Sequence, residues 1–262
     1  MPLQFAGNPI GKPFLELQSI DSTNKYAMRL IHNRHMTEGH DEPQHGMAIF
    51  AHEQTDGKGQ RGKTWTSQKG ANIALSILLN PFQLRITDQF KLSIVAAVSV
   101  HNFFLQYAGD ATKIKWPNDL YWGDRKAGGI LIENVIGGQE SELWRWAVIG
   151  IGININQTSF PANLLNPVSL KQITGKVFEP VELAKELCST LDKNYQLLMQ
   201  AGFEDLFGYY HQHLYKIGEK VRLKKGNRVF ETTIKAVSAT GQLITHHAIE
   251  ERFDFGEVEW VI

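Results

Sequence analysis

The sequence predicts an α+β fold with a small β-barrel at its C-terminal end. Up to about residue 215, segments with helical apolar spacing are interspersed with short apolar strands, which is typical of a sheet covered by helices. After Ile217-Gly218 the pattern changes to short strands separated by glycine turns. We therefore expect a larger domain over residues 1–215 and a barrel over residues 216–262.

The first part of the chain predicts one helix and two strands. A helix is expected over residues 22–34, where Ser22 or Asp21 can cap the N-terminus and Ala27, Leu30 and Ile31 form an apolar stripe. Residues 35–45 are polar and predict an exposed loop, to which we assign no function. A short strand follows over residues 47–51, residues 54–69 are expected to be a loop, and alternation over residues 73–79 predicts a half-buried strand.

The remaining elements follow from the same two periodicities. Residues 87–107 share one apolar helical face. Strands are expected over residues 113–116, 127–135 and 143–151, and helices over residues 180–198 and 203–214, with Pro180 well suited to a first helical turn. In the C-terminal segment, strands are predicted over residues 221–223, 229–237, 242–244 and 258–261.

Composition and charge exclude several classes of protein. The 27 basic residues match the 27 acidic ones, which argues against a nucleic-acid binder of the usual basic kind. Neither a signal peptide nor an apolar run of the ~20 residues that span a bilayer is present, so we expect a cytoplasmic protein without membrane contact. A homodimer is compatible with the sequence, which leaves the oligomeric state open.

Several conspicuous side chains are expected to be structural. Cys188, the single cysteine, lies on the apolar side of a predicted helix, and we expect it to be packed there without reactivity. The ten histidines lack the spacing of a structural metal site. Trp122, Trp144 and Trp146 are expected in the core or at an interface.

Four segments carry residues suited to chemistry. The first, Gln54-Thr55-Asp56-Gly57-Lys58-Gly59-Gln60-Arg61-Gly62-Lys63-Thr64-Trp65, combines glycines with cations, as an anion-binding loop does. The second, Lys113-Ile114-Lys115-Trp116-Pro117-Asn118-Asp119, brings a strand into a polar turn. The third, Arg125-Lys126-Ala127-Gly128-Gly129-Ile130-Leu131-Ile132-Glu133, places a lysine beside two glycines. The fourth, Gly150-Ile151-Gly152-Ile153-Asn154-Ile155-Asn156, ends a buried strand with two amides.

Taken together, in this order, the four segments resemble a biotin protein ligase, that is, a biotin–[acetyl-CoA-carboxylase] ligase. Ser22-Thr23-Asn24 at the first helix and Gly256-Glu257-Val258 near the end extend the resemblance from about Ser19 to the C-terminus. It implies a class II synthetase-like domain, with a central mixed sheet flanked by helices, and an SH3-like barrel. Only about 18 residues precede Ser19, too few for a helix-turn-helix domain, so we expect the single-function type without DNA binding.

The resemblance implies that the protein joins biotin and ATP to form biotinyl-5′-AMP. It then passes biotin to one lysine of a biotin carboxyl carrier protein. Lys126, Arg61 and Lys58 are the implied catalytic cations, with Lys126 ranked first because a strand positions it. The residues implied to hold biotin are Ser22, Thr23, Asn24, Gln54, Gly57, Lys58, Gly59, Gln60, Arg61, Trp116, Lys126, Gly128 and Gly129.

The nucleotide site is implied in the same way. Trp65 would pack on the adenine and Asn154 would bind its edge, while Asn118 and Asp119 would border the phosphates. The full implied set is Arg61, Lys63, Trp65, Asn118, Asp119, Lys126, Ile153, Asn154 and Glu257. Mg²⁺ would be held mostly by ATP, with Asp119 as a weak protein ligand.

The glycine loop carries one hypothesis and one departure from the family. Its glycines make it costly to order, so we expect it to be mobile until the adenylate closes it and excludes water. Gln60 and Lys58 stand where many members have arginines. The role of retaining the adenylate then falls to Lys58 or Arg61, and Arg61→Ala is expected to release adenylate onto bystander proteins.

Three other functions stay open at this stage. A lipoate–protein ligase shares the implied fold, although Gln54 and the Lys-Trp-Pro-Asn-Asp segment favour biotin. A non-catalytic biotin- or adenylate-binding protein is disfavoured by the presence of Lys126 and Arg61. Nucleic-acid binding through the barrel is disfavoured because its aromatic residues are expected to pack inside it.

Overall fold

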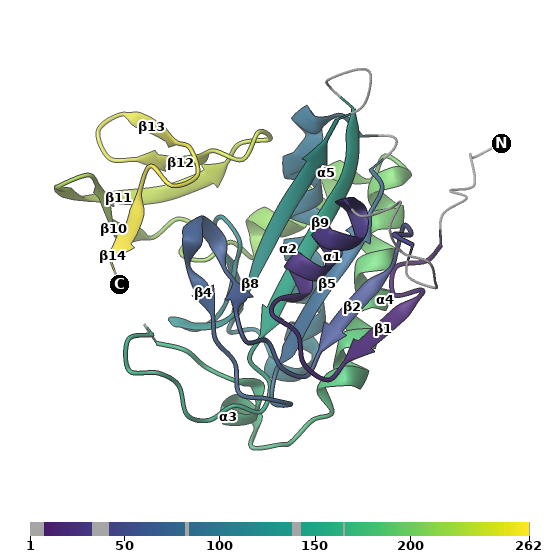
Figure 1. Ribbon diagram of the computed structural model, residues 1–262. Coiled ribbons are helices and arrows are strands. Elements are labelled where there is room, and N and C mark those ends of the chain that lie inside the picture. The colour runs from purple at the N-terminus through teal and green to yellow at the C-terminus, as the bar shows by residue number, and fades with distance from the viewer. Residues whose placement is uncertain (1–7, 33–41, 82–83, 138–142, 165, 262) are drawn as a thin grey trace.

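The computed structural model describes residues 8–32, 42–81, 84–137, 143–164 and 166–261 (Figure 1). Its centre is a seven-stranded sheet in the order β1-β2-β5-β9-β8-β7-β6. β1 and β2 are parallel and every other neighbouring pair is antiparallel, which confirms the predicted mixed sheet. Its strands are β1 (Phe14–Leu17), β2 (Ala48–Ala51), β5 (Ile73–Leu79), β6 (Thr112–Lys115), β7 (Asp119–Trp122), β8 (Arg125–Ile136) and β9 (Trp144–Ile153).

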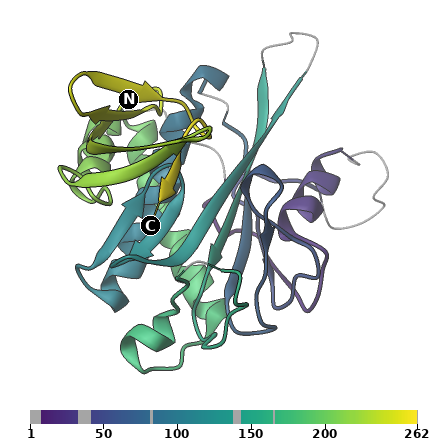
Figure 2. The same ribbon diagram turned by 90° about the vertical axis from the view of Figure 1, so that its left-hand side faces the viewer.

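Helices cover both faces of this sheet (Figure 2). The short helix α1 (Thr23–His32) packs on one face against β2, β5 and β9. On the other face lie the two long helices, α2 (Gln89–Ala108) and α4 (Pro180–Met199), which also pack against each other, with α5 (Phe203–Gln212) beside α2. A short helix, α3 (Leu170–Thr174), follows β9. The two faces have separate apolar cores, the larger under α2 and α4.

Burial on both faces explains one error in the sequence prediction. All seven residues of β5 are buried, whereas the alternation over residues 73–79 predicts a half-buried strand. The smaller side chains that produced the alternation face α1, because a short helix close to the sheet leaves little room there. Ser76 is one of them and is fully buried.

The C-terminal segment, predicted as a small barrel over residues 216–262, forms a separate antiparallel sheet. Five antiparallel strands follow one another in the order β13-β12-β11-β10-β14. They are β10 (Lys220–Lys225), β11 (Arg228–Val237), β12 (Leu243–His246), β13 (Glu250–Phe253) and β14 (Glu259–Val261). We call this segment the small β-domain. Figure 1 shows it beside the β8 side of the central sheet.

The sequence prediction missed β1, β7, β13, α3 and one structured part of the glycine loop. Inside the expected loop, β3 (Gly57–Lys58) and β4 (Thr64–Trp65) pair as a two-stranded ribbon around the turn η1 (Gln60–Gly62). A second short turn, η2 (Ile86–Asp88), precedes α2. These elements are short, so periodicity has too few residues to detect them. Residues 35–41 of the expected loop lie outside the described residues.

The structural role predicted for the cysteine is confirmed. Cys188 is free and only 2% exposed, and burial raises the pKa of its thiol to about 12. Trp144 and Trp146 are buried, and the partly buried Trp122 donates from its indole nitrogen to the carbonyl of Ala108. In the part of the chain that the structure describes, no helix is long and apolar enough to cross a membrane.

Candidate active site

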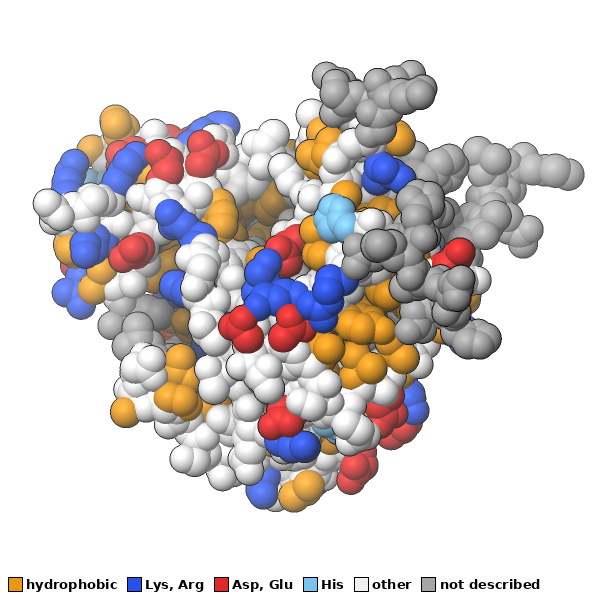
Figure 3. Space-filling model, viewed as in Figure 1, with side chains coloured by type: hydrophobic (Ala, Val, Ile, Leu, Met, Phe, Trp, Pro, Cys, Tyr) orange, Lys and Arg blue, Asp and Glu red, His pale blue; other side chains and the backbone are white. Residues whose placement is uncertain are grey.

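Many of the predicted site residues lie on the face of the sheet that α1 covers. They come from the N-terminus of α1, the β3–β4 ribbon and the strands β7 and β8. Figure 3 views this face, on which basic and acidic side chains meet near the middle. Glycines bring the elements close: a Cβ on Gly150 of β9 would lie 2.3 Å from Oδ1 of Asn24 in α1.

One end of the site is a buried polar cluster, which we call the α1 cluster: Thr23, Asn24, Gln54 and Ser76. The backbone nitrogen and the hydroxyl of Thr23 donate to Oε1 of Gln54, at 2.8 and 3.1 Å. The Ser76 hydroxyl lies 2.7 Å from Oγ1 of Thr23 and 2.5 Å from Oδ1 of Asn24. Ser22, Thr23, Asn24 and Ser76 are each at most 4% exposed, so α1 holds this end rigidly.

The α1 cluster continues into a charged pair on β8. Nδ2 of Asn24 donates to Oε2 of Glu133, and Nζ of Lys58 donates to Oε1 of the same carboxylate at 2.8 Å. Lys58, one of the implied catalytic cations, is therefore already paired with Glu133. The pair fixes the ribbon against β8, because Lys58 belongs to β3.

Lys126 lies at the start of β8 and is paired with Asp119 of β7. Its Nζ donates to Oδ1 of Asp119 at 2.6 Å. A Cβ on Gly129 would be 3.4 Å from both of these polar atoms, so the glycine leaves the pair accessible. Beside it, Nδ2 of Asn118 and Nε2 of Gln60 both donate to the carbonyl of Ile130. Lys126, Asp119, Asn118 and Gln60 are thus brought together as predicted.

Trp65 of the ribbon lies flat against a glycine of β9. A Cβ on Gly152 would be 2.4 Å from the indole ring, so only glycine fits there. The indole nitrogen of Trp65 is buried without a hydrogen-bond partner. A buried donor of this kind is costly, and a ligand acceptor beside it would remove that cost.

Arg61 contacts the small β-domain. Its Nη1 donates to the carbonyl of Gly256 at 3.0 Å, and its guanidinium lies 6.0 Å from the centre of the Phe255 ring. Its backbone φ of 54° is in the left-handed region. To fill the catalytic and ligand-binding roles predicted for it, Arg61 would have to give up this contact with Gly256.

Four other predicted residues make contacts within the fold. The indole nitrogen of Trp116 donates to the carbonyl of Gly241, and the ring is 2% exposed in the main core rather than lining an open slot. The Ile153 side chain is buried in the same core. Nδ2 of Asn154 donates to the carbonyl of Val168 at 3.2 Å. Glu257 accepts from the backbone nitrogen of Asp254 and pairs with Lys225 inside the small β-domain.

The remaining predicted glycines are packing positions in or beside the site. A Cβ on Gly128 would be 2.7 Å from the carbonyl of Gly152, and one on Gly57 would be 2.4 Å from that of Trp65. Gly59 donates its backbone nitrogen to the carbonyl of Lys63, which closes the turn of the ribbon. Glycine is needed at Gly57 and Gly128 because neighbouring backbone atoms leave no room for a side chain.

Three residues of the site were given no role in the sequence analysis. Ser76 is the one hydroxyl in an otherwise apolar strand, and that isolation was a usable signal. Glu133 was quoted in a motif without a role. Lys115 is 7% exposed, and burial lowers its pKa to about 8, with Lys126 and Lys63 contributing as neighbouring cations.

The residues that the structure describes contain no group of three or more His, Cys, Asp or Glu side chains that could hold a metal ion. Asp119 is a single carboxylate, and one of its oxygens already accepts from Lys126. These residues suit a Mg²⁺ ion that is held mainly by a nucleotide, not one held by protein ligands alone.

Known proteins match this chain over most of its length. A model of the biotin/lipoate A/B protein ligase family matches residues 17–154. The bifunctional ligase/repressor BirA of Bacillus spizizenii is 31% identical over 90% of this chain and 70% of its own length. A biotin–[acetyl-CoA-carboxylase] ligase of Paracoccus denitrificans is 27% identical over 87% of this chain and 92% of its own length.

The fold is shared with a solved structure, the biotin protein ligase from Aquifex aeolicus in complex with biotin and ATP. The two superpose with a TM-score of 0.75 at 24% identity, covering 94% of this chain and 97% of the other. Because the family model matches more than half of the chain and the Bacillus relative aligns with nearly all of it, the chain belongs to the biotin/lipoate A/B protein ligase family.

Proposed function

We propose that this protein activates biotin with ATP and transfers it to a lysine of a biotin carboxyl carrier protein. The observation that carries the proposal is that β8 connects the two parts of the site: Asn24 of the buried α1 cluster donates to Glu133 of β8, and Lys126, paired with Asp119, lies at the start of the same strand. A neutral polar ring could bind at one end while phosphate groups meet a cation at the other. A cytoplasmic location stays a prediction.

The α1 cluster has spare hydrogen-bond acceptors. Ser76 donates its single proton toward Oδ1 of Asn24 and Oγ1 of Thr23. Thr23 donates its hydroxyl proton to Gln54, which leaves lone pairs on both hydroxyl oxygens. Biotin's ureido ring offers two N–H donors and one carbonyl. The donors match these hydroxyls, and this match supports biotin over lipoate, whose ring has no N–H group.

The proposed reaction has two steps. In the first, the biotin carboxylate attacks the α-phosphorus of ATP, the P–O bond to pyrophosphate breaks, and biotinyl-AMP forms. Two anions must meet, so the ammonium of Lys126 stabilises the charge on the phosphoryl oxygens. In the second, the carrier lysine, as a free amine, attacks the acyl carbon; AMP leaves with the bonding electron pair and the amine loses a proton. Mg²⁺ on the ATP phosphates would neutralise further charge, with Asp119 in reach as one ligand.

Trp65 and the ribbon are the proposed nucleotide-binding part. An adenine stacked on the indole would cover Trp65 and the Gly152 surface beneath it, and the unpaired indole N–H supports a ligand acceptor nearby. Closure of the loop over the adenylate, and its mobility before closure, stay predictions.

Pyrophosphate exchange tests the activation step. Labelled pyrophosphate should enter ATP when biotin and Mg²⁺ are present, and lipoate in a parallel reaction should give none. Exchange with lipoate alone would transfer the protein to the lipoate branch of the family. Absence of exchange together with biotin binding in calorimetry would favour a non-catalytic binding protein. Transfer is then read as a mass increase on a carrier domain, with its target lysine changed to arginine as control.

A further inference from the structure

Lys115 is a buried cation for which the proposed reaction has no role so far. It ends β6, and its side chain is enclosed by aromatic rings instead of carboxylates. Nζ donates to the hydroxyl of Tyr121 at 3.2 Å and lies 4.7 Å from the centre of that ring. The Trp260 ring of the small β-domain lies 5.1 Å from Nζ on another side.

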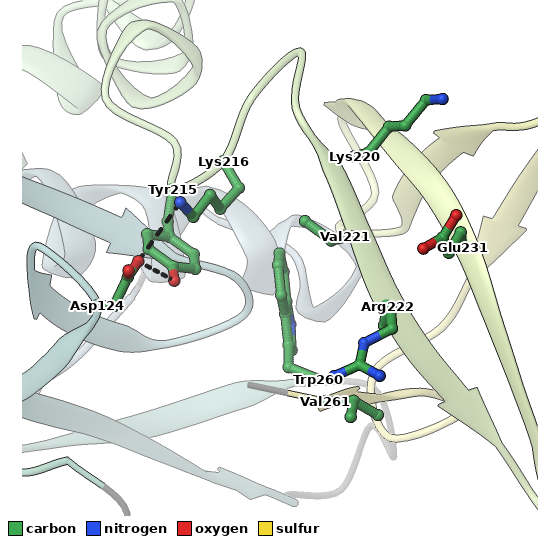
Figure 4. Close-up of a pocket in the computed structure, with 9 residues that line it drawn as sticks. All are labelled: Asp124, Tyr215, Lys216, Lys220, Val221, Arg222, Glu231, Trp260 and Val261. Atoms are coloured by element: carbon green, nitrogen blue, oxygen red, sulfur yellow. Dashed lines mark hydrogen bonds and ion pairs between the residues drawn. The ribbon is translucent and has the colours of Figure 1, made fainter.

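In the part of the chain that the structure describes, no carboxylate forms an ion pair with Lys115. Asp124 lies nearby in sequence, but its Oδ1 accepts from Tyr215 at 2.7 Å and pairs with Lys216. Asp124, Tyr215 and Lys216 line a pocket of about 350 Å³ between the two sheets. Figure 4 shows Trp260 between Tyr215 and Arg222 in this pocket. Trp260 thus both lines this pocket and contacts Lys115.

A buried ammonium without an ion-pair partner costs folding stability, and cation–π contacts offset only part of that cost. At neutral pH the group is still mostly charged, because its pKa is lowered only to about 8. A methionine of similar shape would satisfy the apolar surroundings better. Because the Lys115 ammonium lowers stability at this position, we look for a role for its charge in the candidate site.

The nearest acidic influence on Lys115 is Asp119. The two residues face each other across the β6–β7 pair, and the Asp119 charge favours the protonated form of Lys115. Asp119 is also the partner of Lys126. Asp119 is therefore ion-paired with Lys126 and stands opposite the buried Lys115 in the β6–β7 register.

We propose that Lys115 is a positioning residue that holds Asp119 in place when Lys126 leaves it to bind a phosphate group. This role rests on the proposed function. Lys126 cannot serve a phosphate fully while it is neutralised by Asp119 at 2.6 Å. As Lys126 turns to the incoming anion, Asp119 would be left without its partner, and the fixed charge of Lys115 becomes its counter-charge. Trp260 keeps water from screening this charge.

Lys115→Met tests the proposal because stability and activity should change in opposite directions. We expect the melting temperature to stay unchanged or rise by up to about 5 °C. The KM for ATP in pyrophosphate exchange should rise roughly tenfold, the size of a lost charge-assisted interaction. The KM for biotin should not change. Lys113→Met, the same change two residues earlier on β6, is the matched control and should leave both KM values unaltered.

A double-mutant cycle with Asp119→Asn separates positioning from general support of the fold. If Lys115 acts through Asp119, Lys115→Met should have little further effect on the KM for ATP in the Asp119→Asn background. Additive losses would overturn the proposal, as would a Lys115→Met protein that fails to fold or an unchanged KM for ATP. Absence of biotin-dependent exchange in the unaltered protein would instead refute the proposed function. The melting temperatures of the unaltered and Lys115→Met proteins would still show how much stability the buried charge costs.

Discussion

The two ends of the candidate site are built in different ways. At the α1 cluster, Thr23, Asn24 and Ser76 are nearly inaccessible and bonded to one another. At the phosphate end, the side chains of Lys58 and Lys126 are 42% and 35% exposed, and both are paired with carboxylates. The first end is held in place by its own hydrogen bonds. The second must exchange internal ion pairs for contacts to a ligand.

Because of this difference, substitutions at the two ends should affect stability, ligand binding and catalysis differently. A change at the α1 cluster should reduce stability and biotin binding together, because buried polar atoms lose their partners. A change at the phosphate end should reduce catalysis with little loss of stability, because exposed ion pairs contribute little to folding.

The largest effect is expected for Lys126→Met. Removing the cation that faces the reacting phosphate should lower the exchange rate roughly 100- to 1,000-fold, in line with the loss of one preorganised electrostatic group. Biotin binding in calorimetry should be retained. Lys185→Met, which removes an exposed lysine paired with Glu182 at 2.7 Å, is the control. If the Lys126→Met protein kept full activity, the catalytic role of Lys126 at the phosphate end would be refuted.

Thr23→Val tests the other end and should rank second. The change keeps the shape but removes the hydroxyl that contacts Gln54 and Ser76. We expect a loss of about 1–3 kcal/mol of unfolding free energy, measured in urea, and a biotin affinity weaker by roughly tenfold or more. Thr190→Val, whose hydroxyl only contacts the backbone of α4, is the control. A stable variant with normal biotin affinity would show that the α1 cluster is not a ligand site.

Gly152→Ala should have an intermediate effect confined to the nucleotide. The added methyl group would lie 2.4 Å from the Trp65 ring, so the indole must move. We expect the KM for ATP to rise roughly tenfold, which is the size of one lost stacking contact, with biotin affinity unchanged. Gly208→Ala is a matched control, since nothing lies within 4 Å of the added atom. Equal losses for both ligands would show that the two ends are not separable.

The same contrast explains what the sequence could predict. The long helices and the central strands follow from periodicity, and the resemblance assigned Thr23, Gln54 and Lys126 to one proposed site. Gly152 was recognisable only as part of a motif, since its reason is the Trp65 ring packed on it. The direction of Arg61 was not predictable, because its partner Gly256 lies 195 residues away in another sheet. Lys115 was missed because nothing in its own segment indicates burial by Trp260.

Arg61→Ala should have the smallest effect on the reaction, and it tests whether the phosphate end depends on the small β-domain. The sequence predicts that this variant releases adenylate, with Arg61 as a ligand contact. The structure supplies a different cause, because Arg61 joins the glycine loop to Gly256 and Phe255. Loss of an exposed contact of about 1 kcal/mol or less should raise the KM for ATP only a few-fold.

Bystander labelling then decides which cause applies. With serum albumin added, a loosened loop should release some adenylate and give weak labelling, whereas loss of a direct adenylate contact should give strong labelling at the same KM for biotin. Arg29→Ala is the control, since Arg29 of α1 pairs with Asp21, which precedes the helix. No labelling and no change in KM would mean that the contact with Gly256 does not hold the loop. In that case the glycine loop would close over the phosphate end without help from the small β-domain. The geometry of the phosphate end would then depend on Lys58, Lys126 and their carboxylate partners alone.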